Sequence, residues 1–218
     1  MLSTYDYDIF IFDCDGVILD SNQLKIEAMK IALKDISECN SEINSCIEYF
    51  RNNFGSSRFH HVEYFINDIF LLSGVEKDIA YEKILRNYSS QCKELYLEAE
   101  LTPGIQSVLE KINGSIYIAS GSEQEELREV FNRRGLTKYF NQIYGSPTSK
   151  VDLVRGILQK DDSKKAVMFG DAFSDMRAAE DNGIDFVAYL PYSNVKTELL
   201  RKSQIEGFVA INSWEEIK

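Results

Sequence analysis

Six short apolar runs, the later ones separated by helix-length segments, constrain the fold of this chain most strongly. Strands that alternate with helices form parallel sheets whose connections are right-handed crossovers. The sequence therefore predicts an α/β fold built on a doubly wound parallel sheet. The expected strands are residues 8–12, 115–119, 142–144, 166–169, 186–189 and 208–211, and the expected helices between them are residues 123–134, 151–159 and 173–182.

Residues 22–100 differ from the rest of the chain because they contain no clear strand pattern. Their periodicity indicates about four helices, with breaks near residues 38–41, 52–57 and 73–75. Pro103 suits the start of a helix that runs to Ile112 and marks the return to the alternating pattern. We therefore expect two domains: a core of residues 1–16 and 101–218, and an inserted four-helix domain of residues 17–100.

An excess of acidic residues limits the partners that this chain can bind. The 35 Asp and Glu residues outnumber the 24 Lys and Arg residues, which gives a formal net charge of -11 and excludes nucleic acid as an expected partner. No run approaches the ~18 apolar residues of a membrane span, and the first residues lack the pattern of a secretory leader. The four cysteines show no zinc-type spacing. We expect a cytoplasmic protein without a membrane partner, either a monomer or a homodimer.

Chemically useful side chains follow four of the expected strands, where open parallel sheets bind their ligands. They are Asp13 and Asp15, then Ser120, Gly121 and Ser122, then Lys150, and finally Asp171 and Asp175. Each alone has a structural explanation, since paired aspartates occur in solvated turns and Ser120 can cap a helix. A calcium-binding EF-hand loop is excluded because Val17 stands where a third ligand is required. Their joint occurrence at consecutive strand ends indicates one site with a hydroxyl, an ammonium group and four carboxylates.

The order of these residues resembles the four motifs of the haloacid dehalogenase superfamily of phosphohydrolases. The matching residues are Asp13-Cys-Asp15-Gly16, Ser120, Lys150 and Gly170-Asp171-Ala-Phe-Ser-Asp175. The resemblance extends over nearly the whole chain and includes a helical cap inserted after the first motif. The stretches GVILDSN and FGSSRFHHVEYF are similar to the branch that holds beta-phosphoglucomutase and phosphoglycolate phosphatase. The resemblance implies Mg²⁺-dependent hydrolysis of a small phosphorylated metabolite, for example a sugar phosphate.

The resemblance also implies a role for each core residue. Asp13 would attack the phosphorus and form an aspartyl phosphate, which divides one difficult displacement into two easier ones. Asp15 would protonate the leaving alkoxide and then deprotonate water, which favours ester hydrolysis over carbon–phosphorus or carbon–halogen cleavage. Ser120, the amide of Gly121 and Lys150 would hold the phosphoryl oxygens.

A Mg²⁺ ion is expected at the same strand ends, because an anionic nucleophile needs compensating charge to attack an anionic phosphate. Asp13 and Asp171 would supply carboxylate ligands, and Asp15 would supply its backbone carbonyl. Asp175 would hold these ligands in place without binding the ion directly. With hard oxygen ligands and no histidine or cysteine at the strand ends, the site should prefer Mg²⁺.

The cap is expected to set substrate choice. Residues 55–58 resemble a cap loop that meets the substrate, so Arg58 is expected to contact a distal anionic or hydroxylated group. Ser122 is a further expected substrate contact. Lys25 stands where mutases of this branch carry a histidine, which weakens the mutase interpretation and makes Lys25 itself a candidate contact. Two alternatives to the phosphatase stay open: a sugar phosphomutase, and a non-catalytic binding protein on the same fold.

Other polar residues of the cap have structural interpretations. Asp20 and Ser21 are expected in the hinge that enters the cap, and His60 and His61 are expected to be surface or packing residues.

Overall fold

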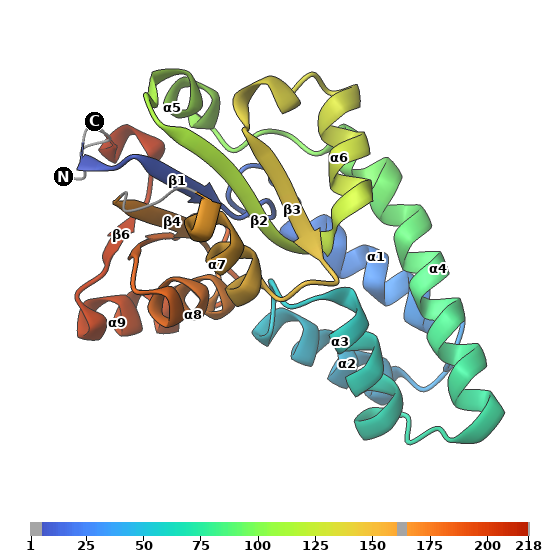
Figure 1. Ribbon diagram of the computed structural model, residues 1–218. Coiled ribbons are helices and arrows are strands. Elements are labelled where there is room, and N and C mark those ends of the chain that lie inside the picture. Colours follow the sequence, from blue (N-terminus) through green and yellow to red (C-terminus); the bar gives the residue numbers. More distant parts are fainter. Residues whose placement is uncertain (1–5, 161–164, 218) are drawn as a thin grey trace.

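The computed structural model of the chain describes residues 6–160 and 165–217. Its centre is a six-stranded sheet in the order β3-β2-β1-β4-β5-β6, and every strand pair is parallel (Figure 1). The predicted α/β class is therefore confirmed. The strands are β1 (Ile9–Phe12), β2 (Ser115–Glu123), β3 (Gln142–Ser146), β4 (Ala166–Gly170), β5 (Asp185–Tyr189) and β6 (Val209–Ile211).

Helices cover both faces of this sheet, because alternate residues of each strand point to opposite sides. Phe10 and Phe12 pack in one apolar cluster with α5 and α6, while Ile9 and Ile11 pack in a second cluster with α7, α8 and α9. The doubly wound arrangement follows from these two clusters. The helices of this part are α5 (Ile105–Lys111), α6 (Gln124–Arg133), α7 (Lys150–Lys160), α8 (Phe173–Asn182) and α9 (Lys196–Glu206), with short 3₁₀ turns at Thr137–Tyr139 and Trp214–Glu216.

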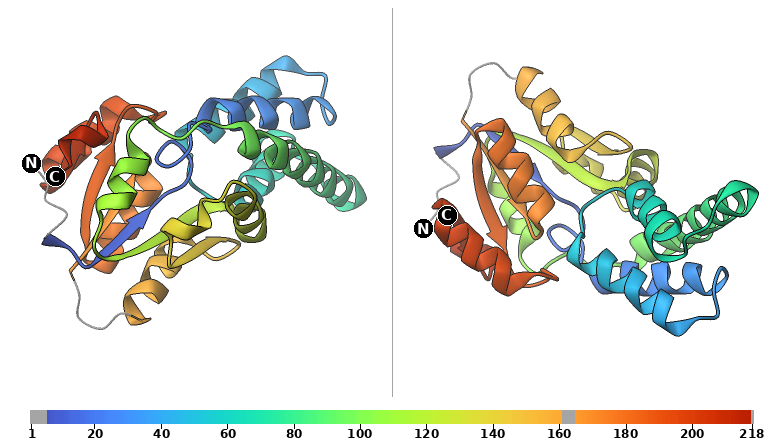
Figure 2. Two further views of the ribbon diagram at one scale, coloured as in Figure 1. Left: turned by 90° about the horizontal axis from the view of Figure 1, so that it is seen from above. Right: turned by 90° about the horizontal axis from the view of Figure 1, so that it is seen from below.

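Residues between β1 and α5 form a group of helices beyond the carboxyl ends of the strands (Figures 1 and 2). We call this group the helical insertion. It consists of α1 (Asn22–Lys34), α2 (Asn40–Asn52), α3 (Arg58–Tyr64) with a π-helical turn at Phe65–Ile69, and α4 (Gly74–Glu98). The helix breaks agree with the predicted ones. The division of the chain into two domains at residues 17 and 100 stays a prediction.

The two connections to the insertion lie against each other. Asp20 donates its amide hydrogen to Glu100 over 2.9 Å, and the amide of Thr102 donates to Ile18 over 3.0 Å. The Thr102 hydroxyl also donates to the carbonyl of Val17 over 2.5 Å. The entry to the insertion and the exit from it are therefore held together at the strand ends.

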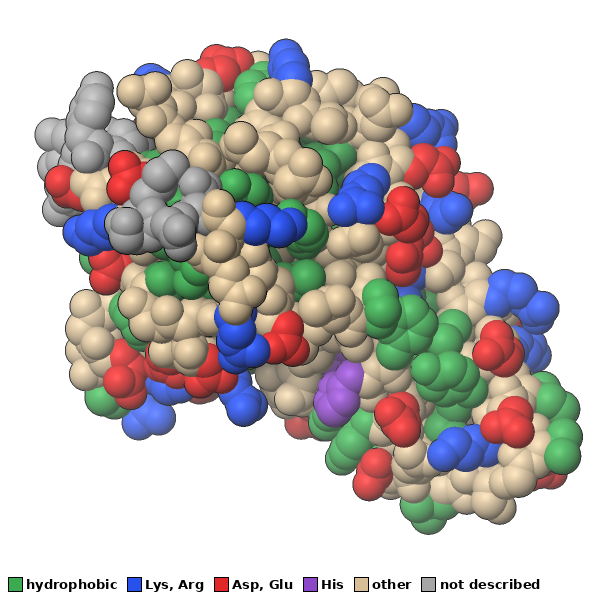
Figure 3. Space-filling model, in the orientation of Figure 1, with side chains coloured by type: hydrophobic (Ala, Val, Ile, Leu, Met, Phe, Trp, Pro, Cys, Tyr) green, Lys and Arg blue, Asp and Glu red, His purple; other side chains and the backbone are tan. Residues whose placement is uncertain are grey.

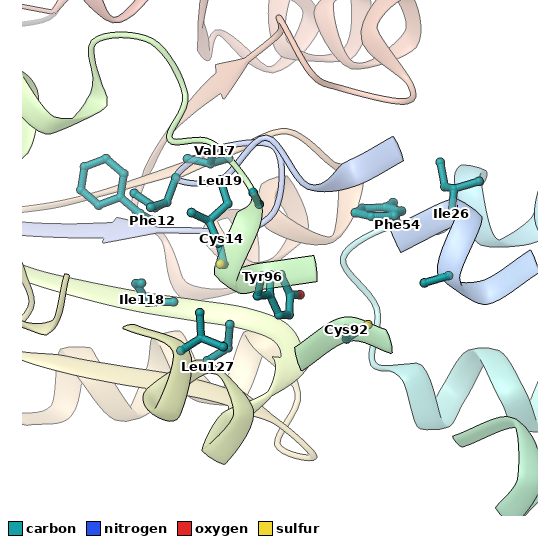
Figure 4. Close-up of a cluster of buried hydrophobic side chains, with 14 of the residues drawn as sticks. Phe12, Cys14, Val17, Leu19, Ile26, Phe54, Cys92, Tyr96, Ile118 and Leu127 are labelled. Carbon is teal, nitrogen blue, oxygen red and sulfur yellow. The ribbon is translucent and has the colours of Figure 1, made fainter. Parts of the chain in front are cut away.

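The insertion packs onto the sheet domain through a continuous apolar cluster. Figure 4 shows Phe12 and Ile118 of the sheet together with Ile26, Phe54 and Tyr96 of the insertion, and all of these side chains are buried. The burial of such side chains from water contributes about 1.5–3 kcal/mol each. The structure therefore shows the insertion in contact with the strand ends.

The surface carries charges of both signs. Acidic and basic side chains are interspersed on the face in Figure 3. Among the described helices, none is long and apolar enough to cross a bilayer.

Candidate active site

The register of the three central strands brings the first and fourth motifs together. Phe12 pairs with Ile118 on one side and with Phe169 on the other, so Asp13 is level with Ala119 and Gly170. Asp171 and the start of α8 follow immediately after Gly170. The register of the strands therefore brings Asp13 and Asp171 to the same edge of the sheet, as predicted.

Strand β2 continues further than the apolar pattern predicts. It runs to Glu123, with an irregular register between Ala119 and Glu123. Ser120 therefore lies within the strand and does not cap a helix, because Glu123 caps α6 by accepting a hydrogen bond from the amide of Glu126. The Ser120 hydroxyl accepts a hydrogen bond of 3.1 Å from the amide of Ser122.

Three buried carboxylates form a cluster that could hold a cation. One oxygen from each of Asp13, Asp171 and Asp175 lies within 4.8 Å of the others. Asp13 Oδ2 and Asp171 Oδ1 have no hydrogen-bond partner among the described residues. Burial and the charge of Asp175 raise the pKa of Asp13 to about 7, and the same causes raise that of Asp171 well above its usual value. Unpaired, mutually repelling carboxylates are the environment that a hard divalent cation such as Mg²⁺ stabilises.

Lys150, the first residue of α7, is fixed between two members of this cluster. Its ammonium lies 3.1 Å from Asp13 Oδ1 and contacts Asp175 Oδ1 at short range. Burial disfavours the charge, but the two carboxylates outweigh it and raise the pKa of Lys150. Asp175 is itself held by the amide of Ala172, which donates to its Oδ2 over 3.0 Å. Lys150 is therefore a protonated, oriented cation beside Asp13.

Asp15 points away from the carboxylate cluster into a hydrogen-bond network of its own. The carboxylate accepts hydrogen bonds from Ser21 Oγ (2.6 Å), Lys25 Nζ (2.8 Å), Ser122 Oγ (2.9 Å) and Tyr96 Oη (2.9 Å). Burial raises the pKa of Asp15, but the charge of Lys25 and these hydrogen bonds outweigh burial and hold it below its usual value. The carboxylate of Asp15 is therefore ionised and is not part of the acidic cluster. The predicted metal contact of Asp15 concerned only its backbone carbonyl.

Lys25 and Ser122, two predicted substrate contacts, thus lie beside Asp15 and also contact each other over 2.8 Å. Ser21 and Tyr96 were not predicted as site residues. Ser21 belongs to the expected hinge, and Tyr96 lies on α4, far along the chain from Asp15. Only the packing of the insertion onto the strand ends reveals them.

Asn22 is another residue that the sequence analysis missed. Its amide donates to Asp171 Oδ2 over 2.6 Å and to the carbonyl of Tyr192 over 2.9 Å. Gly16, with φ +72°, lies against the same carboxylate, since a Cβ there would be 2.5 Å from Asp171 Oδ2. A side chain at position 16 would therefore displace Asp171.

The loop after α2 lies directly over the site. Gly55 has φ +85°, and a Cβ on it would collide with Ser174 Oγ and lie 3.3 Å from Lys150 Nζ. A Cβ on Gly121 would collide with the carbonyl oxygen of Gly55. This close approach of two glycines holds the insertion against the strand ends beside Lys150.

Gly55→Ala should hinder that approach while leaving the sheet unchanged. We expect kcat/KM for a small phosphomonoester to fall at least about tenfold, because closure would be incomplete. Steady-state kinetics would measure this loss. Gly156→Ala is the matched control, since Gly156 lies in α7 with nothing within 4 Å of its added Cβ, and activity there should be unchanged. A normal rate in Gly55→Ala would show that the approach is not needed.

Arg58 forms a buried ion pair that the sequence analysis did not predict. Its guanidinium is buried and donates two hydrogen bonds to Glu126 of α6, from Nη1 to Oε1 (2.9 Å) and from Nη2 to Oε2 (2.7 Å). A third hydrogen bond of 2.5 Å reaches Ser89 Oγ. The charge of Arg58 is thus neutralised by the carboxylate of Glu126. The sequence analysis did not predict Glu126 as a site residue.

The two histidines of α3 have separate environments. Nε2 of His60 lies 3.1 Å from the Tyr49 hydroxyl near the surface. His61 is buried, with its ring 4.7 Å from that of Phe50, and burial lowers its pKa to about 3. His61 is therefore neutral at physiological pH.

Comparison with known proteins identifies the family of this chain. The family model described as haloacid dehalogenase-like hydrolase matches residues 10–189, and the chain belongs to this family. The resemblance stated from the sequence is therefore confirmed. No curated protein matches the chain significantly.

Solved structures of low sequence identity share the fold. A predicted phosphatase from Clostridium acetobutylicum has a TM-score of 0.74 at 18% identity and covers 96% of this chain and 95% of its own. A haloacid dehalogenase-like hydrolase from Streptococcus pneumoniae has a TM-score of 0.70 at 21% identity, with 94% of both chains covered. A beta-phosphoglucomutase from Clostridium difficile has a TM-score of 0.69 at 21% identity, covering 97% of this chain and 93% of its own. The proteins that share this fold therefore include a predicted phosphatase and a beta-phosphoglucomutase.

Proposed function

We propose that this protein is a Mg²⁺-dependent phosphatase that hydrolyses a small phosphomonoester through an aspartyl phosphate on Asp13. The observation that carries the proposal is the placement of Asp13 in a buried carboxylate cluster, beside the ammonium of Lys150. Membership of the haloacid dehalogenase-like hydrolases supports it. The predicted-phosphatase neighbour supports it only at the level of fold.

Asp13 is the proposed nucleophile because it lies at the end of the central strand β1 and has an oxygen without a hydrogen-bond partner among the described residues. Lys150, Ser120 and the amide of Gly121 would hold the phosphoryl oxygens while charge moves from the nucleophile to the leaving group. Lys150 suits this role since its position and charge are fixed before substrate binds.

Asp13 and Asp171 would each offer the Mg²⁺ ion one carboxylate oxygen, which leaves the other oxygen of Asp13 for attack, and the backbone carbonyl of Asp15, together with Asp175, would support the site. When bound, the ion would neutralise negative charge shared between the nucleophile and the phosphoryl group. Asn22 would keep Asp171 in place through its 2.6 Å hydrogen bond.

Asp15 is the proposed acid and base. It would protonate the leaving alkoxide and then take a proton from the water that attacks the aspartyl phosphate. Because its pKa is held below the usual value, Asp15 starts in the ionised form that the second step requires. Ser21, Tyr96 and Ser122 orient the carboxylate toward one side of the site.

A screen of phosphate release would test the proposed function. Small phosphomonoesters, a sugar phosphate and a generic aryl phosphate would be incubated with the protein and Mg²⁺. We expect inorganic phosphate to be released from at least one natural ester and from the aryl phosphate. A phosphomutase would isomerise a sugar phosphate without net release, and a binding protein would turn over neither compound. Either result would contradict the phosphatase proposal.

Metal binding can be tested without any activity. In chelator, the free energy of unfolding should fall as pH rises from about 4 to about 7, since the folded chain keeps a proton on Asp13 that the unfolded chain releases. Mg²⁺ replaces that proton, so it should raise the unfolding temperature more at pH 8 than at pH 5. Thermal unfolding would measure both effects.

Asp171→Asn is the control for this experiment. The variant should lose most of the stabilisation by Mg²⁺, because one of the two direct carboxylate ligands is gone. An equal effect of Mg²⁺ at both pH values, or in wild type and variant alike, would contradict the proposed metal site.

A further inference from the structure

A small enclosed cavity lies between the insertion and the end of β2. Its free volume is about 10 Å³, room for about one water molecule, and its lining includes Lys25, Arg58, His61, Gly121 and Ser122. Lys25 and Ser122 both contact the carboxylate of Asp15. The cavity therefore adjoins the proposed acid and base.

Buried polar atoms of the lining lack partners. Arg58 is 4% exposed and His61 is 1% exposed, yet Nε of Arg58 and Nδ1 of His61 have no hydrogen-bond partner among the described residues. Leaving such a buried group unpaired costs about 1–3 kcal/mol, more for a charged one. A ligand oxygen that accepts a hydrogen bond from Arg58 would remove this cost, so the cavity favours a group with acceptor capacity.

The cations around the cavity are already neutralised. Lys25 pairs with Asp15 at 2.8 Å, and Arg58 pairs with Glu126 at 2.7 Å, with all four side chains largely buried. His61 carries no charge, because burial lowers its pKa to about 3. A second anion here would meet no uncompensated cation and would lie near two carboxylates, where charges interact strongly for lack of water.

We propose that Glu126 determines the charge of the substrate: by neutralising Arg58, it makes the lining of this cavity favour an uncharged hydroxyl of the leaving group and disfavour a second anion. The inference rests on the proposed function, since it names the class of ester that the site hydrolyses. The sequence left open whether Arg58 contacts an anionic or a hydroxylated group. The ion pair with Glu126 decides for the hydroxylated one.

A pair of esters that differ in one group tests this inference. 2-Hydroxyethyl phosphate and phosphoglycolate have the same length, and a hydroxymethyl group in the first replaces a carboxylate in the second. Wild type should prefer 2-hydroxyethyl phosphate at least about tenfold in kcat/KM. Glu126→Gln frees the charge of Arg58 and should shift the ratio of the two kcat/KM values toward phosphoglycolate by about ten- to a hundredfold.

Glu125→Gln is the matched control, because Glu125 lies on the same helix with its side chain 72% exposed and should leave the ratio unchanged. Arg58→Met serves as a second background. In it, adding Glu126→Gln should no longer change the ratio of the two kcat/KM values. The ratio does not depend on how much of a variant is folded. A wild-type preference for phosphoglycolate, or equal ratios in Glu126→Gln and wild type, would overturn the inference.

Binding separates this inference from the proposed function. Calorimetry would give the dissociation constants of both esters for wild type and for Glu126→Gln. If no phosphate is released but 2-hydroxyethyl phosphate binds more tightly to wild type and the order changes in the variant, hydrolysis alone is refuted and the inference stands. Tighter binding of phosphoglycolate to wild type, or binding of neither ester, would overturn it.

Discussion

Asp13→Asn should reduce phosphate release more than about 10³-fold, with the fold intact. Both half-reactions pass through a bond to the Asp13 carboxylate, and an amide cannot form it. The loss of even one stabilising donor costs about 10²- to 10³-fold in other enzymes, so loss of the nucleophile should cost more. Steady-state release from an aryl phosphate would measure the effect.

Asp78→Asn provides the control for this variant. Asp78 is an exposed aspartate of α4, and its loss should leave the rate unchanged. Circular dichroism should show the same secondary structure for both variants. Activity of Asp13→Asn within tenfold of wild type would refute Asp13 as the nucleophile.

Asp15→Asn should affect substrates unequally. An alkyl alkoxide is a poor leaving group and needs a proton as it departs, whereas an aryl oxide leaves with little help. We expect a loss of about 10²- to 10⁴-fold for an alkyl phosphate and a loss at least about tenfold smaller for an aryl phosphate. Comparison of kcat/KM for the two substrates gives the result. Equal losses would remove Asp15 from the role of acid.

The fold could be predicted from the chain because its strands are short and apolar. Strand β1 has an uninterrupted apolar sequence, Ile9–Phe12, and is buried on both faces. Such a run is typical of a central strand in a parallel sheet. The end of β2 could not be predicted. Ser120 and Ser122 are buried polar residues in a strand, and Ser122 contacts Lys25 and Tyr96 of the insertion.

The core of the site could be predicted because its residues directly follow strands. Adjacent parallel strands end at the same edge of the sheet. The residues that follow them therefore lie together, as Asp13, Lys150, Asp171 and Asp175 do here. The partners supplied by the insertion could not be predicted in this way. Tyr96 reaches Asp15 from α4, and neither its local sequence nor its helical periodicity distinguishes it from an ordinary core tyrosine.

The ion pair between Arg58 and Glu126 shows the same limit. The residues are 68 positions apart, on α3 and α6, and each alone is a charged residue of the kind usually found at the surface. Only the packing of the insertion onto α6 brings them together and buries them. The sequence indicated that Arg58 lies near the site, but its partner changes the substrate that we expect.

Catalysis through a phosphoryl group on Asp13 leaves a covalent trace on the protein. The most direct measurement is mass spectrometry of the peptide that contains Asp13, after acid quench within the first turnover of an aryl phosphate. We expect one phosphoryl group on Asp13 that disappears as inorganic phosphate accumulates, and none in Asp13→Asn. Phosphate release without any phosphoryl group on Asp13, or with the group on another residue, would contradict the account.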